Sequence, residues 1–126
     1  MNFLELIMEN VGIVIPAYNE EKRIGLTLES YSEFFENIRK KTKMDYQIIV
    51  VINNTKDRTE EIVKKFSKIN ERIKYLNLPK GGKGYAVIEG FKEALRSNFE
   101  IIGFVDADMA TSPEEYFKLI NNMNDY

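Results

Sequence analysis

The sequence predicts an α/β fold in which helices cover both faces of a mostly parallel β-sheet. Short apolar runs rich in Val and Ile, such as Val11–Ile15 and Gln47–Ile52, lack polar alternation, as expected for strands buried on both faces. The longer segments between them repeat apolar residues at helical spacing. The 126 residues, 44% hydrophobic and 30% charged, fit one globular domain, which we expect to span residues 1–126.

Strands and helices are expected to alternate along the chain. The strands are predicted at Val11–Ile15, Gln47–Ile52, Arg72–Leu78 and Glu100–Val105. The helices are predicted at about Glu20–Lys40, Asp57–Ile69 and Tyr85–Ser97, with a last helix that runs from the Thr111-Ser112-Pro113 start to the end of the chain.

Turn and capping residues predict where these elements begin and end. Pro16 is expected to end the first strand, because proline cannot donate a hydrogen bond to a neighbouring strand. Asn19 is expected to cap the first helix, and either Thr55 or Asp57 the second. A hydroxyl residue followed by Pro113 and two acids is typical of a helix start.

Strict alternation of strands and helices predicts a Rossmann-like parallel sheet with right-handed crossovers. The commonest strand order for such a half-sheet is 3-2-1-4, in which the chain reverses direction between strands 1 and 4. Ligands bind beyond the carboxyl ends of those two strands. In this sequence those ends are residues 16–20 and 106–108, which we expect to converge.

The composition excludes several kinds of chemistry. Cysteine and histidine are both absent, so the chain cannot hold a Ser-His-Asp triad, a Cys-His pair or a thiolate zinc site. Any bound metal needs oxygen ligands, which favours Mg²⁺ or Mn²⁺. A net charge of −2 without a basic face indicates that nucleic acid is not a partner. The apolar runs are too short to span a bilayer and the N-terminus lacks a secretory signal pattern, so a cytoplasmic location is expected.

Asp106-Ala107-Asp108 follows directly after the fourth predicted strand. If the chain there is extended, residues two apart point to the same side, and both carboxylates can reach one ligand. Two hard oxygen donors suit a divalent cation that bridges a diphosphate. The alternative is a polar loop that caps the following helix.

Two further loops carry candidate binding residues. The segment Pro16–Glu21 offers an aromatic ring for stacking on a base and acids that accept hydrogen bonds, although it also suits ordinary helix capping. The segment Lys80–Gly84 fails both the phosphate-loop pattern and the dinucleotide fingerprint. It remains either an anion-binding helix N-terminus that includes Lys83 or a helix entry with solvated lysines.

Together these segments resemble family 2 glycosyltransferases. The resemblance rests on Val14–Glu21, on Ile49–Val51 with the polar turn through Thr59, on Lys80–Gly90 and on Phe104–Asp108. It is closest to the dolichyl- or polyprenyl-phosphate glucosyl- and mannosyltransferases and covers nearly the whole chain. The resemblance implies the N-terminal half of the GT-A fold, which binds a UDP- or GDP-sugar.

The resemblance also implies roles for individual residues. Asn53 holds the base-reading position, Asp106 contacts the donor, and Asp106 and Asp108 bind Mg²⁺ or Mn²⁺ on its diphosphate. The other implied donor contacts fall in two segments. Those against the base and ribose are Pro16, Ala17, Tyr18 and Glu20, and the one at the cationic helix start is Lys83.

The sequence departs from the family pattern at two positions and in length. Asn53 stands where relatives carry Asp, which leaves the choice of base open, and Ala110 stands where mannosyl-type relatives carry a metal-binding Gln, which favours a glucosyl donor. Family catalytic domains are considerably longer, and their second half holds the acceptor site and catalytic base. We therefore assign no catalytic base and expect the isolated chain to bind nucleotide weakly and to turn over little or nothing.

Other functions stay open at this stage. In the favoured interpretation, an inverting metal-dependent transferase acts on a polyprenyl phosphate acceptor at a membrane surface. The main alternative is a non-catalytic nucleotide-binding module that a partner chain completes through an open sheet edge. A nucleotidyltransferase is a third possibility, although those enzymes usually carry a glycine-rich loop where this chain has Pro16-Ala17-Tyr18.

Overall fold

The computed structural model describes residues 10–123 of the chain, and these form alternating strands and helices as predicted. The elements are β1 (Asn10–Ala17), α2 (Ile24–Lys41), β2 (Asp45–Asn53), α3 (Thr59–Ile69), β3 (Ile73–Leu78), α4 (Lys83–Leu95), β4 (Ile101–Phe104) and α5 (Pro113–Met123). The predicted continuation of the last helix to the end of the chain lies outside the described residues.

The four strands form one parallel sheet in the order β3-β2-β1-β4, which confirms the predicted topology. The central strands β1 and β2 are apolar along most of their length because each has a hydrogen-bonded neighbour on both sides and a helix layer on both faces. Their carboxyl ends, and that of β4, therefore meet at the same edge of the molecule.

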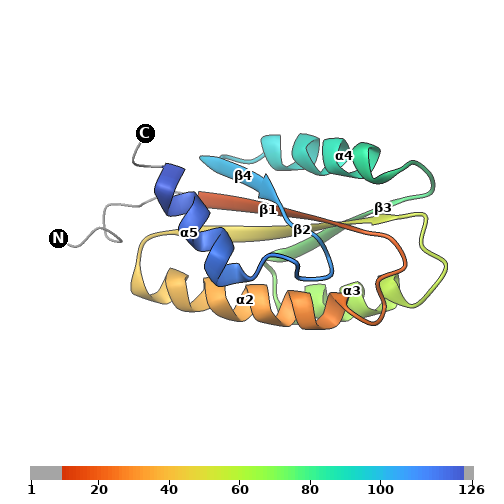
Figure 1. Cartoon of the computed structure of the whole chain (residues 1–126), viewed down its shortest axis with the longest axis horizontal. Coiled ribbons are helices and arrows are strands. Elements are labelled where there is room, and N and C mark those ends of the chain that lie inside the picture. The colour runs from red at the N-terminus through yellow and green to blue at the C-terminus, as the bar shows by residue number, and fades with distance from the viewer. Residues whose placement is uncertain (1–9, 124–126) are drawn as a thin grey trace.

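Helices cover both faces of the sheet (Figure 1). On one face, α2, α3 and α5 pack on the strand residues Ile13, Ile15, Ile48, Val50 and Ile52. On the other face, α4 packs on Val14, Ile49 and Val51 and is the only described helix there. The strand residues alternate between two apolar cores, as the period of a β-strand requires. Among the helices between residues 10 and 123, none combines the length and apolar character needed to cross a bilayer.

Helix α4 approaches the sheet closely at Gly90, which is buried. A Cβ atom added there would lie 2.4 Å from Cγ1 of Val14 and 2.9 Å from Cγ2 of Val51. Both distances are shorter than packed carbon atoms tolerate. Glycine at this position is therefore what lets the helix backbone rest directly on the β1 and β2 side chains.

The prediction that Pro16 ends the first strand is wrong, because Pro16 pairs with Val51 inside β1. The carbonyl of Val14 accepts a hydrogen bond from the Val105 N–H, so the backbone of Val14 faces β4. Pro16, two residues on, faces the same side at a point where β4 has already ended at Phe104. The missing N–H of proline therefore leaves no partner in the sheet unpaired.

The predicted helix caps are partly wrong. Asn19 does not cap α2, which begins only at Ile24; its Oδ1 instead accepts a hydrogen bond from the Lys56 N–H at 2.9 Å. At α5 the predicted start is confirmed, because the Ser112 hydroxyl accepts from the Glu115 N–H at 3.2 Å and donates to the Glu115 carboxylate at 3.1 Å. The first of these bonds is the N-cap bond expected of a Ser at a helix start, and the second joins the hydroxyl, not the backbone N–H of Ser112, to the Glu115 carboxylate.

Candidate functional site

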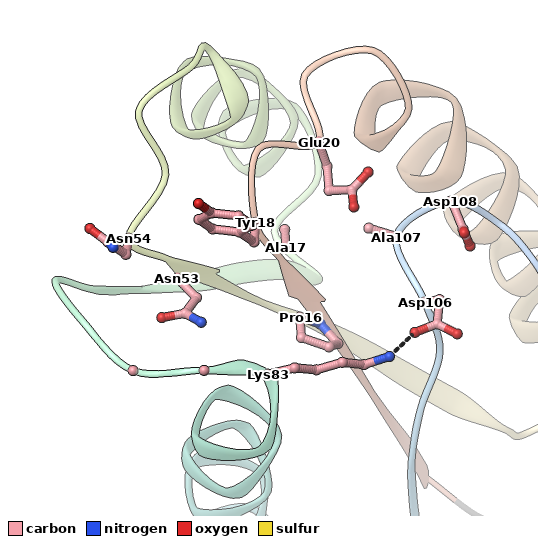
Figure 2. A pocket seen from close by; sticks show the side chains of 12 residues that line it. Pro16, Ala17, Tyr18, Glu20, Asn53, Asn54, Lys83, Asp106, Ala107 and Asp108 are labelled. Carbon is pink, nitrogen blue, oxygen red and sulfur yellow. Dashed lines mark hydrogen bonds and ion pairs between the residues drawn. The ribbon is translucent and has the colours of Figure 1, made fainter.

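A pocket of about 590 Å³ opens at the carboxyl ends of β1, β2 and β4 (Figure 2). Every binding residue predicted from the sequence lies in its wall, with four residues that were not predicted. The predicted residues are Pro16, Ala17, Tyr18, Glu20, Asn53, Lys83, Asp106 and Asp108, and the others are Asn54, Gly81, Gly82 and Ala107. The expected convergence of strand ends 1 and 4 is therefore present, and the end of strand 2 joins them.

The loop after β1 forms one wall of the pocket and carries Tyr18, whose side chain is 57% exposed. Three hydrogen bonds tie this loop to the loop after β2. The N–H of Glu20 donates to Thr59 Oγ1 at 2.8 Å, that of Glu21 to Asp57 Oδ2 at 3.1 Å, and that of Lys56 to Asn19 Oδ1. The Tyr18 wall is thus held in place by residues of the neighbouring crossover.

The Asp57 carboxylate accepts hydrogen bonds from both of these loops. Its other oxygen, Oδ1, accepts from the N–H and the hydroxyl of Thr59, at 3.0 Å and 2.5 Å. Partial burial would raise the pKa of Asp57, but the hydrogen bonds from Thr59 and Glu21 outweigh it and hold the pKa below its usual value. The carboxylate is therefore ionised at neutral pH and acts as a fixed acceptor for both loops.

Asn53 ends β2 at the back of the pocket. The residue is only 4% exposed, and its Oδ1 accepts no hydrogen bond from the described part of the chain. Figure 2 shows the side chain between Tyr18 and the loop that leads to Lys83. A buried acceptor without a partner costs about 1–3 kcal/mol, so a ligand that brings an N–H to this position gains affinity.

The start of α4 forms the opposite wall. Gly81 has a φ of 111°, and a Cβ there would lie 2.4 Å from the Tyr85 ring, so only glycine fits. Gly82 is the N-cap residue, no side chain caps the helix, and a Cβ at Gly82 would meet no atom within 4 Å. The first N–H groups of α4 therefore have no side-chain acceptor among the described residues, and a helix start of this kind can bind an anion, which the helix dipole also favours.

The loop after β4 carries Asp106 and Asp108 and is anchored from below by α2. The hydroxyl of Thr27 donates to the Ala107 carbonyl at 2.5 Å, and the hydroxyl of Tyr31 donates to the Thr111 carbonyl at 2.6 Å. Burial raises the pKa of Tyr31, so the phenol keeps the proton that it donates. The two carboxylates therefore stand on a fixed backbone.

The expectation that Asp106 and Asp108 lie on extended chain is wrong. The Met109 N–H donates to the Asp106 carbonyl at 3.2 Å, which closes a turn, and Met109 has a φ of 59°. Asp108 Oδ1 accepts from the Ala110 N–H at 3.0 Å. Both side chains still line the pocket, but the turn and not strand alternation brings them there.

Asp106 is paired with Lys83 across the pocket, with 2.6 Å between Lys83 Nζ and Asp106 Oδ1 (Figure 2). Within residues 10–123 no group of three or more potential ligand residues gathers to hold a metal alone. Two carboxylates beside a helix start without a side-chain cap nevertheless fit Mg²⁺ or Mn²⁺, because such ions commonly take one or two carboxylates and complete their shell with water and substrate phosphate.

Comparison with known families decides what kind of protein carries this pocket. The model of glycosyl transferase family 2 matches residues 12–126. The chain belongs to this family. The resemblance seen in the sequence is thereby confirmed, and the nucleotidyltransferase alternative has no support.

Individual relatives agree with this membership. The chain is 36% identical over 115 residues to a dolichyl-phosphate beta-glucosyltransferase from Trichomonas vaginalis, an alignment of 90% of this chain and 34% of that protein. It is similar to the mannosyltransferase PcManGT from Pyrobaculum calidifontis in complex with GDP-Man and Mn²⁺, with TM-score 0.61, 25% identity and coverage of 78% of this chain and 27% of that one. A mycobacterial protein of known crystal structure shares the fold with TM-score 0.71 and 22% identity, over 100% of this chain and 42% of that one. The chain thus spans about a third of the curated relative's length.

Several residues that build this pocket were not singled out in the sequence, although Gly81 and Gly82 lie in the segment Lys80–Gly84 that was named as a candidate binding loop. Asn54, Gly81 and Gly82 occupy turns, where nothing in their spacing predicts which of them face a ligand. Thr27 had a readable signal, because it is a hydroxyl residue within the apolar stripe of Ile24, Leu28 and Tyr31. A buried hydroxyl at such a position needs an acceptor, and the Ala107 carbonyl supplies it.

Proposed function

We propose that this chain is the donor-binding part of an inverting, metal-dependent glycosyltransferase that uses a UDP- or GDP-sugar. The observation that carries the proposal is the pocket itself. In one hollow it joins an exposed aromatic ring, a buried amide whose oxygen has no partner among the described residues, a cationic helix start and two carboxylates. The ring suits stacking on the base and the amide suits the hydrogen-bonding edge of the base. The helix start suits the diphosphate, and the carboxylates suit the cation bound to it.

The residues divide between the parts of the donor. Tyr18 and Glu20 would contact the base and ribose together with the buried Pro16 and Ala17. Lys83 and the free N–H groups of α4 would bind the diphosphate. Asp106 and Asp108 would hold Mg²⁺ or Mn²⁺, which stabilises the negative charge that develops on a departing nucleoside diphosphate.

For the acceptor we propose a polyprenyl phosphate at a membrane surface. The support is the similarity to a dolichyl-phosphate beta-glucosyltransferase, of which this chain aligns with 34%. A phosphate acceptor is already ionised at neutral pH, so it needs less help from a general base than a sugar hydroxyl does. The acceptor pocket and the base belong, in this proposal, to sequence outside the chain, and the 126 residues alone would turn over little.

One observation favours a second candidate, a nucleotide-binding module that a partner chain completes. Strand β4 lies at the edge of the sheet, pairs within the described residues only with β1, and exposes 47% of Phe104. An open edge beside an exposed aromatic residue is a template for pairing with another chain. Concentration-dependent dimerisation in sedimentation experiments would support this candidate, whereas a monomer that binds UDP would weaken it.

Calorimetric titration of the chain with UDP, GDP and their sugars, with Mn²⁺ and with EDTA, tests the main proposal. We expect binding that weakens at least about tenfold in EDTA, which corresponds to ~1.4 kcal/mol. Asp108→Ala should lose the same factor, whereas the control Asp45→Ala, at the far end of the sheet, should bind as the parent does. Binding that survives both EDTA and Asp108→Ala contradicts the metal assignment, and a folded chain that binds no nucleotide contradicts the whole proposal.

A further inference from the structure

We infer that Thr27 and Tyr31 of α2 are positioning residues that set the affinity of the pocket for a divalent cation, although neither side chain lines the pocket. The inference rests on the proposed function, because it assumes that Asp106 and Asp108 hold that cation. It deepens the proposed function by naming residues behind the pocket wall that prepare the two carboxylates for the metal.

The turn that carries the two carboxylates has a backbone conformation that its own contacts do not explain. Met109 has a φ of 59°, in the left-handed region, which is strained for a residue with a Cβ atom. Such a conformation persists only where the surrounding structure holds it. The hydrogen bonds from the Met109 and Ala110 N–H groups, to the Asp106 carbonyl and to Asp108 Oδ1, join residues of the turn and cannot fix it against the rest of the molecule.

Helix α2 supplies fixed points on both sides of Met109. The Thr27 hydroxyl donates to the carbonyl of Ala107, two residues before Met109, at 2.5 Å. The Tyr31 hydroxyl donates to the carbonyl of Thr111, two residues after it, at 2.6 Å. The two donors are four residues apart, so they project from the same face of α2. Both side chains are buried, with 1% and 0% of their surface exposed, and the strained turn is therefore held from one rigid element.

The Thr27 hydroxyl has an alternative acceptor within its own helix. It lies 3.1 Å from the Arg23 carbonyl, the kind of acceptor that a helical threonine commonly uses. A hydroxyl has one proton to donate, and the contact with the Ala107 carbonyl is the shorter of the two. The hydroxyl therefore serves the turn in preference to its own helix.

The Ala107 carbonyl belongs to the short segment that separates the two carboxylates, and Figure 2 shows Asp106 and Asp108 on either side of it. Without the Thr27 hydroxyl this buried carbonyl has lost its donor, and the peptide gains free energy by turning toward water. That rotation would move the two carboxylates relative to each other. The affinity for the metal should then fall, whereas the loops after β1 and β2, which contact the base and ribose in the proposed function, keep their positions.

Calorimetric titration with UDP, once in Mn²⁺ and once in EDTA, isolates this effect. The ratio of the two dissociation constants is the metal enhancement of nucleotide binding. Thr27→Val removes the hydroxyl with little change in volume, and we expect it to lower the metal enhancement at least about fivefold, since hydrogen bonds that orient metal ligands commonly contribute about tenfold or more to metal affinity. Its affinity for UDP in EDTA should stay within about twofold of the parent.

Tyr31→Phe should act in the same direction with a smaller effect. Its acceptor, the Thr111 carbonyl, lies beyond both carboxylates at the start of α5, so we expect a loss of about threefold in the metal enhancement. Mn²⁺ titration of the nucleotide-free chain, followed by electron paramagnetic resonance, should give the same order of metal affinity: the parent binds most tightly, then Tyr31→Phe, then Thr27→Val.

Two further variants separate positioning from stability. Thr42→Val removes a hydroxyl that donates to the Ile38 carbonyl near the other end of α2, and it should keep the parent's metal enhancement. Thr27→Ser keeps the hydroxyl and loses a buried methyl group. It should therefore unfold at a lower urea concentration than the parent and yet retain the parent's metal enhancement. If Thr27 merely stabilised the fold, the metal enhancement would instead follow stability across all of these variants.

The outcomes distinguish this inference from the proposed function. If folded Thr27→Val and Tyr31→Phe keep the parent's metal enhancement, or if Thr27→Ser loses it as Thr27→Val does, the inference is overturned and donor binding stands. If Thr27→Val does not fold, as judged by circular dichroism, Tyr31→Phe decides alone, with Tyr46→Phe at the amino end of the sheet as its control. A folded parent that binds no UDP, or binds it equally in Mn²⁺ and EDTA, contradicts the proposed function, and the inference fails with it.

Discussion

The two ends of the sheet carry hollows of similar size and opposite character. The carboxyl end holds the pocket of about 590 Å³, and the amino end holds a second hollow of about 530 Å³. At the amino end Arg72 donates to Asp45 at 2.8 Å, and the hydroxyl of Tyr46 accepts from Asn70 and donates to Glu36. At the carboxyl end, within residues 10–123, Asn53 Oδ1 has no partner and the start of α4 has no side-chain cap.

Of these two hollows, the one suited to a ligand is therefore distinguished by its unsatisfied polar groups and not by its size. Polar groups that pair with one another stabilise the fold and have little left for a ligand. Groups that stay unpaired at a buried site carry a penalty that a ligand can remove. Substitutions at the amino end should therefore change the free energy of unfolding, and substitutions at the carboxyl end should change nucleotide affinity.

The largest effect is expected at Asp57, because its substitution should change both the free energy of unfolding and the nucleotide affinity. Asp57→Ala removes hydrogen bonds to Glu21 and Thr59, and we expect the free energy of unfolding to fall by about 2 kcal/mol, since hydrogen bonds to charged groups contribute about 1.5–3 kcal/mol each. Nucleotide affinity should fall too, because the Tyr18 loop loses its tie. Urea unfolding measures the first effect and calorimetry the second.

The pH dependence of this effect has a defined sign. The pKa of Asp57 is lowered in the folded chain, so its contribution is fully present above the ordinary aspartate pKa of about 3.9 and is lost as pH falls through the folded value. The stability gap between parent and Asp57→Ala should hold from pH 7 to pH 5 and narrow toward pH 3. A gap that widens in acid would contradict the role of the ionised carboxylate.

The next effect concerns Lys83, whose ammonium group forms an ion pair with the Asp106 carboxylate in the structure. We expect Lys83→Met to weaken UDP binding by about tenfold, or ~1.4 kcal/mol, because the diphosphate loses a cation. In the absence of nucleotide the same change should strengthen Mn²⁺ binding, since Asp106 no longer pairs with an internal cation. Mn²⁺ titration followed by electron paramagnetic resonance, with exposed Lys80→Met as the control, checks both directions. Weaker Mn²⁺ binding in Lys83→Met would contradict the competition.

The smallest effect is expected at the amino end. Arg72→Ala breaks the pair with Asp45, whose pKa the Arg72 hydrogen bond holds below its usual value. Because both side chains are partly exposed, the loss should be about 1 kcal/mol or less. This contribution should be fully present above the ordinary aspartate pKa of about 3.9 and should be lost as pH falls further, through the lowered pKa of Asp45 in the folded chain. Nucleotide affinity should stay within twofold of the parent. A larger change would contradict the prediction that substitutions at the amino end of the sheet affect stability and not nucleotide binding.

The sequence predicted the topology and the position of the pocket well, for a physical reason. Continuous apolar strands such as β1 and β2 must lie inside a parallel sheet, and strict alternation with helices leaves few strand orders. Once the order is 3-2-1-4, the residues after strands 1 and 4 must converge. Tyr18 and Asp106 could therefore be placed in one hollow without knowledge of any contact between side chains.

The local geometry could not be predicted, because it depends on contacts between distant segments. Asn19 was expected to cap the first helix, but its side chain instead accepts a hydrogen bond from the Lys56 N–H in the loop after β2. Strand-like alternation was expected at Asp106 and Asp108, but the left-handed conformation of Met109 turns the chain. Sequence spacing describes neighbours along the chain, and both of these outcomes were decided by packing across it.

The close approach at Gly90 links the interior of the molecule to its binding surface. About two helical turns separate Gly90 from Lys83 on the same rigid rod. The depth at which α4 rests on Val14 and Val51 therefore sets how far the lysine reaches toward Asp106. A methyl group added at Gly90 would move α4, and with it Lys83, away from the sheet without altering any residue that lines the pocket. The distance between the Lys83 ammonium and the Asp106 carboxylate thus depends on the lack of a side chain at position 90.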